Sequence, residues 1–340
     1  MRHPRRPQPL LALRDALFVL PAVLGAACVG GPPSQEGPDD EQLLELYTTS
    51  ATYFYEDDNL SQAQEQAVKA LEIEPNHKAM RRMIGWVRVR QGQAEDLIIA
   101  EQFFRKLVRE GDENSATTLG LATTLERLGV GYEEAARDFR AGAREVPAGK
   151  DREAYADRTA QQAVELWNEA IAILEGTLEG GEGSTRAMNG LQRLYALRGD
   201  YEESLRWSEI LLDRSRAELA TWRRLLTDGN LTESEEQLYR TNEQASLDLC
   251  RNTHLFAATL LHRQGRSRDA VAHLDQVLAS EPDLAQAYSQ RGQLLLELGD
   301  FEDAKRDLNR FIGLSDAPFG HPDLERAFQL LAECESRGRG

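Results

Sequence analysis

The sequence predicts an all-α fold, a solenoid of stacked antiparallel helical hairpins that is irregular in its middle. Composition is the first indication: 29% charged, 41% hydrophobic and only 7% aromatic residues suit amphipathic helices with one wet face. The second is a period of 34 residues. Four positions of the C-terminal third, Leu261, Gly265, Ala270 and Leu274, recur at that distance as Leu295, Gly299, Ala304 and Leu308.

The period has a mechanical explanation. Each unit holds two helices: Gly closes the turn between them, a small residue lets the pair approach closely, and Pro, as at Pro282, ends the second helix. One hairpin cannot bury its apolar face alone, so neighbouring hairpins share a core. We therefore expect C-terminal units over residues 185–318 and an amphipathic capping helix over residues 321–337.

Residues 1–27 have the composition of a signal peptide. Several arginines precede an uncharged stretch, Ala16 to Ala27, which is too short to span a bilayer and runs directly into Cys28. The run Leu24-Gly25-Ala26-Ala27-Cys28 resembles a bacterial lipobox, although that motif usually places Leu, Val or Ile where Gly25 stands. We expect export into a bacterial cell envelope and lipid attachment at Cys28, at the outer membrane and facing the periplasm. A plain secretory signal cut after Ala27 is the alternative.

The middle of the chain holds further units. Residues 28–41, rich in Gly and Pro, are predicted as a flexible linker, and residues 42–179 as N-terminal units. The first unit closes with the run Ala70-Leu71-Glu72-Ile73-Glu74-Pro75-Asn76, the second turns at Gly92, and the third, residues 115–147, is expected to turn near Gly129. On these residues the chain resembles the tetratricopeptide repeat family, in particular its bacterial lipoproteins.

Two stretches depart from the repeat. No Gly or Pro interrupts the run from residue 151 until Gly176, so this stretch is a degenerate unit or one long helix. A long helical insertion is expected at about residues 213–250, with a helix that ends near Leu226. The next helix restarts at Thr232, where Thr232 and Glu235 form a capping box.

The resemblance also implies a binding surface, because the first helix of every hairpin in this family lines a concave groove. The family's frame places these residues in the groove: Arg82, Trp86, Val89, Arg90, Glu126, Arg127, Arg186, Asn189, Arg193, Asn252, His262, Arg263, Gln286, Gln293 and Glu297. The arginines either pair with carboxylates of a partner or form ion pairs within the chain itself. Trp86 would be an anchor for the partner.

The remaining patterns argue against other functions. A formal net charge of −17 makes nucleic acid a poor partner. Apart from Cys28, only Cys250 and Cys334 occur, with no metal-ligand spacing, and they are predicted as buried thiols or a disulfide bridge. His254 and His262 are expected to have separate roles, in packing and in the groove. No catalytic or phosphate-binding motif is present, so we expect no enzyme activity, no cofactor and no metal.

The sequence therefore predicts a scaffold or adaptor of the bacterial cell envelope that binds segments of other proteins, such as envelope assembly components, in a concave groove. The alternative is a binding module for a cell-wall or small-molecule ligand at the long central helices. A defined apolar pocket within residues 150–250 would favour that alternative, and an open polar groove would favour proteins.

Overall fold

The computed structural model describes residues 39–179, 184–227 and 229–338. The predicted signal peptide of residues 1–27, the predicted lipid-attachment residue Cys28 and most of the predicted linker lie outside these ranges. The first helix begins at Asp40, inside the range assigned to the linker. It starts there because the Asp39 side chain accepts a hydrogen bond from the backbone N–H of Gln42 and caps the helix.

Every regular element in the described ranges is a helix, which confirms the all-α prediction. The helices are α1 (Asp40–Glu56), α2 (Leu60–Ile73), α3 (Lys78–Gln91), α4 (Ala94–Arg109), α5 (Ser115–Ala141), α6 (Arg152–Glu179), α7 (Thr185–Arg198), α8 (Tyr201–Leu226), α9 (Glu233–Arg263), α10 (Ser267–Ser280), α11 (Ala285–Leu298), α12 (Phe301–Leu314) and α13 (Pro322–Arg337). Within the described part of the chain, no helix is both long enough and apolar enough to cross a bilayer.

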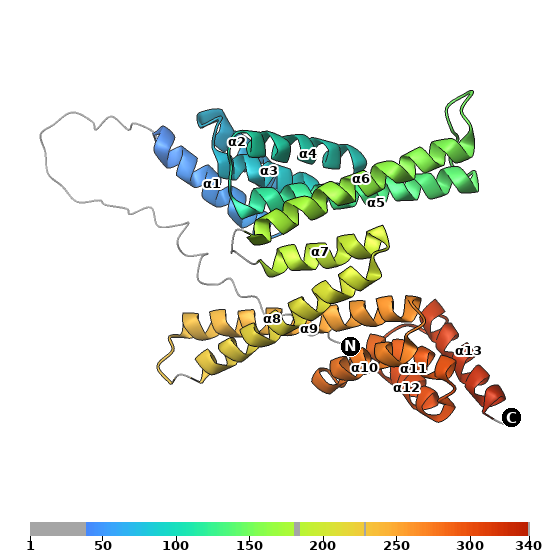
Figure 1. Ribbon diagram of the computed structural model, residues 1–340. Coiled ribbons are helices and arrows are strands. Elements are labelled where there is room, and N and C mark those ends of the chain that lie inside the picture. The colour runs from blue at the N-terminus through green and yellow to red at the C-terminus, as the bar shows by residue number, and fades with distance from the viewer. Residues whose placement is uncertain (1–38, 180–183, 228, 339–340) are drawn as a thin grey trace, which may run out of the picture.

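Each helix packs against the next one along the chain, and the helices form a stack of hairpins (Figure 1). The hairpins are α1–α2, α3–α4, α5–α6, α7–α8, α9–α10 and α11–α12, and α13 packs on the last of them. Gly199 and Gly299 end α7 and α11 with φ of 90° and 87°, a conformation that favours glycine. The first helix α5 also contacts the first helices α3 and α7, which places the exposed faces of these helices on one side of the stack.

The third predicted unit is wrong in one respect. Helix α5 runs without a break through Gly129, where a turn was expected. A Cβ on Gly129 would lie 2.3 Å from Nε1 of Trp167, so this glycine admits the indole of α6 instead of making a turn. The chain turns at Gly142, with φ of 74°. Residues 152–179 then form one long helix, the second helix of the same hairpin.

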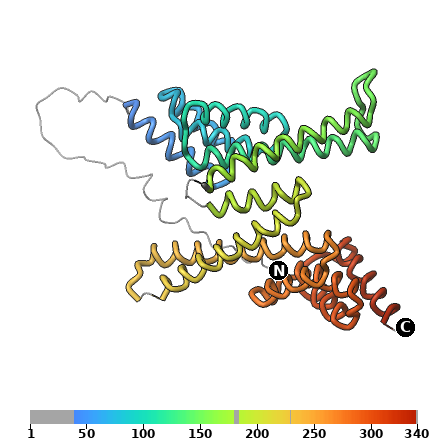
Figure 2. The backbone as a smooth tube through the Cα atoms, viewed as in Figure 1, coloured from blue at the N-terminus to red at the C-terminus, as the bar shows by residue number. Residues whose placement is uncertain are grey.

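In the predicted insertion before α10, the long helices α8 and α9 pack against each other, although they belong to successive hairpins. Helix α8 ends at Leu226 as predicted, and the predicted capping box of Thr232 and Glu235 begins α9. The rings of Trp222 and Tyr239 stack between these helices at 5.9 Å. Figure 2 shows that the α5–α6 and α8–α9 pairs extend beyond the neighbouring hairpins, on opposite sides of the molecule. A smooth superhelix is therefore interrupted twice.

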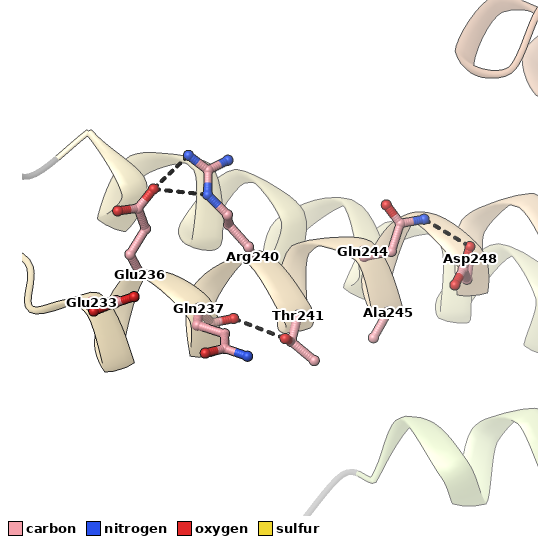
Figure 3. Close-up of a pocket in the computed structure, with 8 residues that line it drawn as sticks. All are labelled: Glu233, Glu236, Gln237, Arg240, Thr241, Gln244, Ala245 and Asp248. Carbon is pink, nitrogen blue, oxygen red and sulfur yellow. Dashed lines mark hydrogen bonds and ion pairs between the residues drawn. The ribbon is translucent and has the colours of Figure 1, made fainter. Parts of the chain in front are cut away.

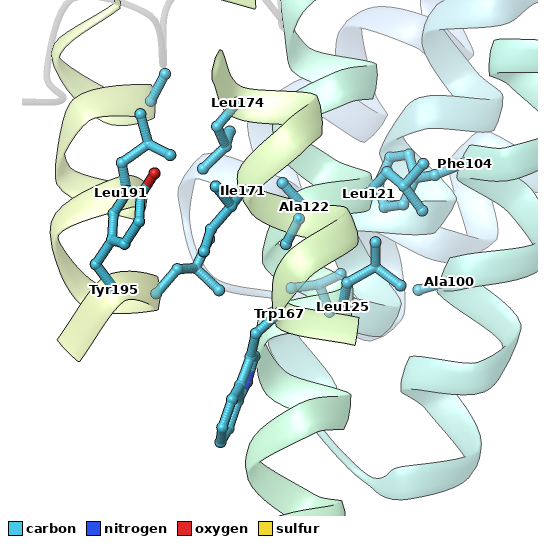
Figure 4. Close-up of a cluster of buried hydrophobic side chains, with 14 of the residues drawn as sticks. Ala100, Phe104, Leu121, Ala122, Leu125, Trp167, Ile171, Leu174, Leu191 and Tyr195 are labelled. Carbon is cyan, nitrogen blue, oxygen red and sulfur yellow. The ribbon is translucent and has the colours of Figure 1, made fainter. Parts of the chain in front are cut away.

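The largest cluster of buried side chains joins α3 through α7 (Figure 4). Phe104 of α4 is fully buried in this cluster, and a Cβ on Gly85 or Gly120 would come within 2.7 Å or 2.4 Å of its ring. Leu191 and Tyr195 of α7 belong to the same cluster. The predicted division between units 42–179 and 185–318 stays a prediction, and this core runs across it.

Candidate partner-binding groove

A cavity of about 470 Å³ lies where the first helices of four consecutive hairpins meet. Helix α5 contributes five of its twelve lining residues and α7 contributes four, and α1, α3 and α6 contribute one each. The lining residues are Tyr55, Trp86, Ala116, Leu119, Ala122, Thr123, Glu126, Leu174, Arg186, Asn189, Gly190 and Arg193. Five of the predicted groove residues therefore lie together, although they are distributed over more than a hundred residues of sequence.

Trp86 forms the wall that α3 contributes. Its indole Nε1 donates a 3.1 Å hydrogen bond to the carbonyl oxygen of Ala116 on α5. Its ring meets Phe104 edge to face, with 5.8 Å between the centroids. The side chain is half-buried. These contacts hold the indole in place, so the part that lines the cavity is a rigid apolar surface for a ligand.

Arg82 is engaged within the chain. Its guanidinium donates a 2.8 Å hydrogen bond to Oδ2 of Asp112, which also accepts a 2.5 Å hydrogen bond from the Thr117 hydroxyl. Burial alone would raise the pKa of Asp112, but the hydrogen bonds from Thr117 and Arg82 lower it below its ordinary value. The charged carboxylate thus ties α3 to the start of α5, and Arg82 has little left to offer a partner.

Arg90 and Arg127 connect successive first helices. Arg90 of α3 donates a 2.9 Å hydrogen bond to the carbonyl oxygen of Tyr55, in the last turn of α1. Arg127 of α5 donates a 2.5 Å hydrogen bond to the carbonyl oxygen of Val89, in the last turn of α3. The last carbonyls of a helix have no partner inside it, so each arginine caps the first helix of the preceding hairpin. Arg90 also pairs with Asp58 at 2.7 Å.

The α7 residues complete the cavity. Arg193 forms a bidentate pair with Glu126 of α5, with both hydrogen bonds at 2.8 Å, and these hydrogen bonds raise the pKa of the arginine. Asn189 is half-buried beside it. Arg186 is exposed and lines the same cavity. Its charge is close enough to the Tyr55 hydroxyl to lower that group's pKa, against the larger effect of burial, which raises it.

The C-terminal hairpins form a second, smaller cavity of about 190 Å³ between α9, α10 and α11. His262 and Gln293, both predicted for the groove, line it together with Gln290. Nδ1 of His262 lies 3.3 Å from Oε2 of Glu297, also a predicted groove residue, but without hydrogen-bond geometry. Oε1 of Gln290 is buried and likewise has no hydrogen-bond partner among the described residues.

The other predicted groove residues lie apart from these cavities. Asn252, Arg263 and Gln286 are exposed and line neither of them. The prediction for Val89 is wrong: its side chain is 1% exposed and belongs to the core cluster around Phe104. It faces α5 because α3 and α5 are in direct contact along this side.

Comparison with known proteins identifies the repeats. Residues 257–317 match the sequence profile of a family described as Tetratricopeptide repeat. The matched range contains the units in which the 34-residue period is clearest, and it folds into helical hairpins as that family does.

Residues 257–317 belong to the tetratricopeptide repeat family.

No curated protein matches the chain, but solved structures do. A tetratricopeptide repeat protein from Parabacteroides merdae is 20% identical, covers 86% of this chain and 99% of its own, and has a TM-score of 0.36. Residues 1–338 of Acl4, an assembly chaperone of RpL4, are 17% identical, cover 89% of this chain and 100% of their own, and have a TM-score of 0.39. The TPR2AB domain of yeast Sti1 in complex with pHSP90 is 12% identical, covers 87% of this chain and 99% of its own, and has a TM-score of 0.28. Likenesses this distant say nothing about the ligand.

Tetratricopeptide repeat proteins generally mediate protein–protein interactions and are generally not enzymes. Another cavity among the described residues does not enclose a ligand site. It measures about 710 Å³, but all of its lining residues come from the single helix α9 (Figure 3). Glu236 pairs with Arg240, and Gln244 donates to Asp248, in each case four residues along the same helix. The lining is therefore a solvated helix face.

One buried contact was not predicted. His254 has a packing role, as expected, and is 8% exposed. Its Nδ1 lies 2.9 Å from Nδ1 of His273 on α10, and its Nε2 lies 3.5 Å from the guanidinium of Arg216 on α8. A guanidinium only donates, so Nε2 of His254 accepts and its Nδ1 donates to His273. Within the described residues, no three His, Cys, Asp or Glu side chains are placed to hold a metal.

Sequence reasoning also missed the apolar part of the cavity. Tyr55 at the end of α1, Leu119 on α5 and Leu174 on α6 also line the cavity. The family's groove positions in the first helices would not have indicated Leu174, because it belongs to a second helix. Its side chain reaches the cavity over Gly190, where a Cβ would come within 2.7 Å of Cδ1 of Leu174. A small residue on α7 was the only signal for this contact.

Proposed function

We propose that this protein is a scaffold of the bacterial cell envelope that holds a segment of a partner protein in the groove formed by α1, α3, α5 and α7. The observation that carries the proposal is the cavity of about 470 Å³ shared by these helices. It combines a fixed aromatic wall at Trp86 with the charged side chains of α7, as sites for extended or helical segments do.

A protein segment is favoured over a cell-wall fragment or small molecule at the central long helices. The cavities on α8 and α9 in the described ranges are open surface patches, each lined by one helix only. Trp222 borders the patch on α8, and most of its other lining side chains are polar. Neither patch encloses a ligand. We also infer that the chain is not an enzyme, because its charged groove residues are engaged mainly in ion pairs that join helices.

The envelope location rests on the N-terminal sequence. An exported chain with acyl groups on Cys28 would be attached to the outer membrane, with its repeats facing the periplasm and other envelope proteins within reach. The test compares the wild type with Cys28→Ser after labelling with a fatty-acid analogue and membrane fractionation. The variant is expected to lose both the label and the membrane association. A label that persists in Cys28→Ser would refute lipid attachment at this residue.

The groove is tested by photo-crosslinking in the native envelope. A photoreactive residue at Asn189, inside the cavity, should give discrete adducts with partner proteins that mass spectrometry identifies. The same residue at Gln102, which is exposed on the second helix α4, is the control and should give none of these adducts. Identical adducts at both positions, or adducts at Gln102 alone, would move the binding surface away from the groove.

A further inference from the structure

Charge and apolar surface lie side by side in the groove cavity, and only part of the charge is neutralised. Arg193 is held by Glu126 through two hydrogen bonds of 2.8 Å. Arg186 lines the same cavity and is exposed, and it makes no hydrogen bond or ion pair with any residue in the described ranges. Among the described residues that line the cavity, two arginines thus face one glutamate, which gives this lining an excess of one positive charge in a chain whose net charge is −17.

The apolar part of the cavity is already in its binding shape. Trp86 is held by its hydrogen bond to Ala116 and by the edge of Phe104. Leu174 is buried against α7, where Gly190 admits it. A ligand side chain that entered here would find a surface whose own side chains have little rotamer freedom left to lose, which favours binding.

We propose that this cavity binds a partner segment in which a large apolar side chain stands next to a carboxylate, with the apolar group against Trp86 and the carboxylate on Arg186. This inference rests on the proposed function and specifies its ligand. A purely apolar segment would cover Arg186 without pairing it, and a basic segment would bring a third cation to the cavity.

The charge of the cavity explains why an acidic segment would bind here and not elsewhere on the surface. Over most of a surface with net charge −17 an acidic segment is repelled, so a site with excess positive charge is where it binds best. The arginines elsewhere in this part of the groove do not compete for the carboxylate. Arg82 and Arg90 each form an ion pair with a carboxylate of the chain, and Arg127 donates a hydrogen bond to a carbonyl oxygen at the end of α3.

The experiment is a selection from a displayed library of random 12-residue peptides on the immobilised full-length chain. We expect enrichment of peptides with Phe, Trp, Tyr or Leu within two positions of Asp or Glu. Arg186→Glu should exchange the acidic preference for Lys or Arg, and should weaken an enriched acidic peptide roughly tenfold in fluorescence anisotropy, as the loss of a charge-assisted hydrogen bond does. Arg268→Glu, the same change at an exposed position of α10, is the matched control and should alter neither.

The outcomes separate the two proposals. Enriched peptides without an acidic preference, or a preference that Arg186→Glu leaves unchanged, would overturn this inference while leaving the groove as a binding site. No enrichment of any sequence over the bare support would overturn both. Arg186 is exposed, so Arg186→Glu is expected to fold, and an unchanged circular dichroism spectrum verifies this. Arg186→Lys is a second variant that keeps the charge, and it should retain the acidic preference with weaker binding.

The carboxylate could come from a side chain or from the C-terminus of the partner. One enriched peptide is therefore compared with its C-terminally amidated form and with forms in which Gln or Asn replaces Glu or Asp. Loss of binding on neutralising the side chain, but not on amidation, assigns the contact to a side chain, and the converse assigns it to a terminus. Binding that survives both changes together would overturn the inference.

Discussion

Gly120→Ala tests how the hairpins that carry the groove are packed. The Phe104 ring is fully buried between α3 and α5, and a Cβ on Gly120 would lie 2.4 Å from two of its carbons. The ring has little room to retreat, because it is fully buried and its tip also lies close against Gly85, where even a Cβ would come within 2.7 Å of Cζ. Overpacking of this kind lowers the free energy of unfolding by about 1–3 kcal/mol, and the better helix propensity of Ala offsets at most about 1 kcal/mol of that loss. We expect a net loss of about 1–2 kcal/mol in the free energy of unfolding.

The assay is urea unfolding followed by circular dichroism at 222 nm, with Gly131→Ala as the matched control. Gly131 lies on the same helix, and nothing is within 4 Å of its Cβ position, so Ala there should stabilise the chain by up to about 1 kcal/mol. Combining Gly120→Ala with Phe104→Leu should cost less than the two single changes added together, because the smaller side chain leaves room for the methyl group. The reasoning is refuted if Gly120→Ala unfolds at the same urea concentration as Gly131→Ala, or at a higher one.

Three further predictions concern charge and capping. Burial, then His273 and Arg216, lower the pKa of His254 from 6.5 to about 4, so its contribution to stability is complete above pH 6.5 and is lost as the pH falls toward 4. The loss in the free energy of unfolding is on the order of 3 kcal/mol. His254→Phe should therefore flatten the dependence of the urea midpoint on pH in this range. An unchanged slope would mean that other groups cause the pH dependence. Thr232→Ala removes one half of the capping box of α9 and should cost about 1 kcal/mol, measured by urea unfolding; no loss would mean that the end of α9 is frayed. Asp307→Asn weakens the bidentate pair with Arg291, whose hydrogen bonds measure 2.6 and 2.8 Å. The free energy of unfolding, measured in urea, should fall by on the order of 2 kcal/mol. A variant as stable as the wild type would show that Asp275 suffices to hold Arg291.

The sequence could predict which side chains of successive first helices lie together, but it could not predict which of the arginines among them are paired. Trp86, Arg186 and Arg193 meet in one cavity because equivalent positions of successive hairpins face the same side. Whether an arginine is paired depends on residues far along the chain: Glu126 is 67 positions from Arg193, and Asp112 lies in a loop 30 positions from Arg82. No local pattern contains that information.

The sequence by itself determined the helices and most of their ends. Apolar periodicity, glycine at the ends of α7 and α11, and the box at Thr232 act over a few residues, so they can be read locally. Only the tertiary structure decided what Gly129 does. A glycine in a helical pattern predicts a turn or a close packing contact equally well, and Trp167, 38 residues further on, makes it a packing contact. That one contact turns an expected pair of short helices into α5, and with it the third hairpin into a projecting arm.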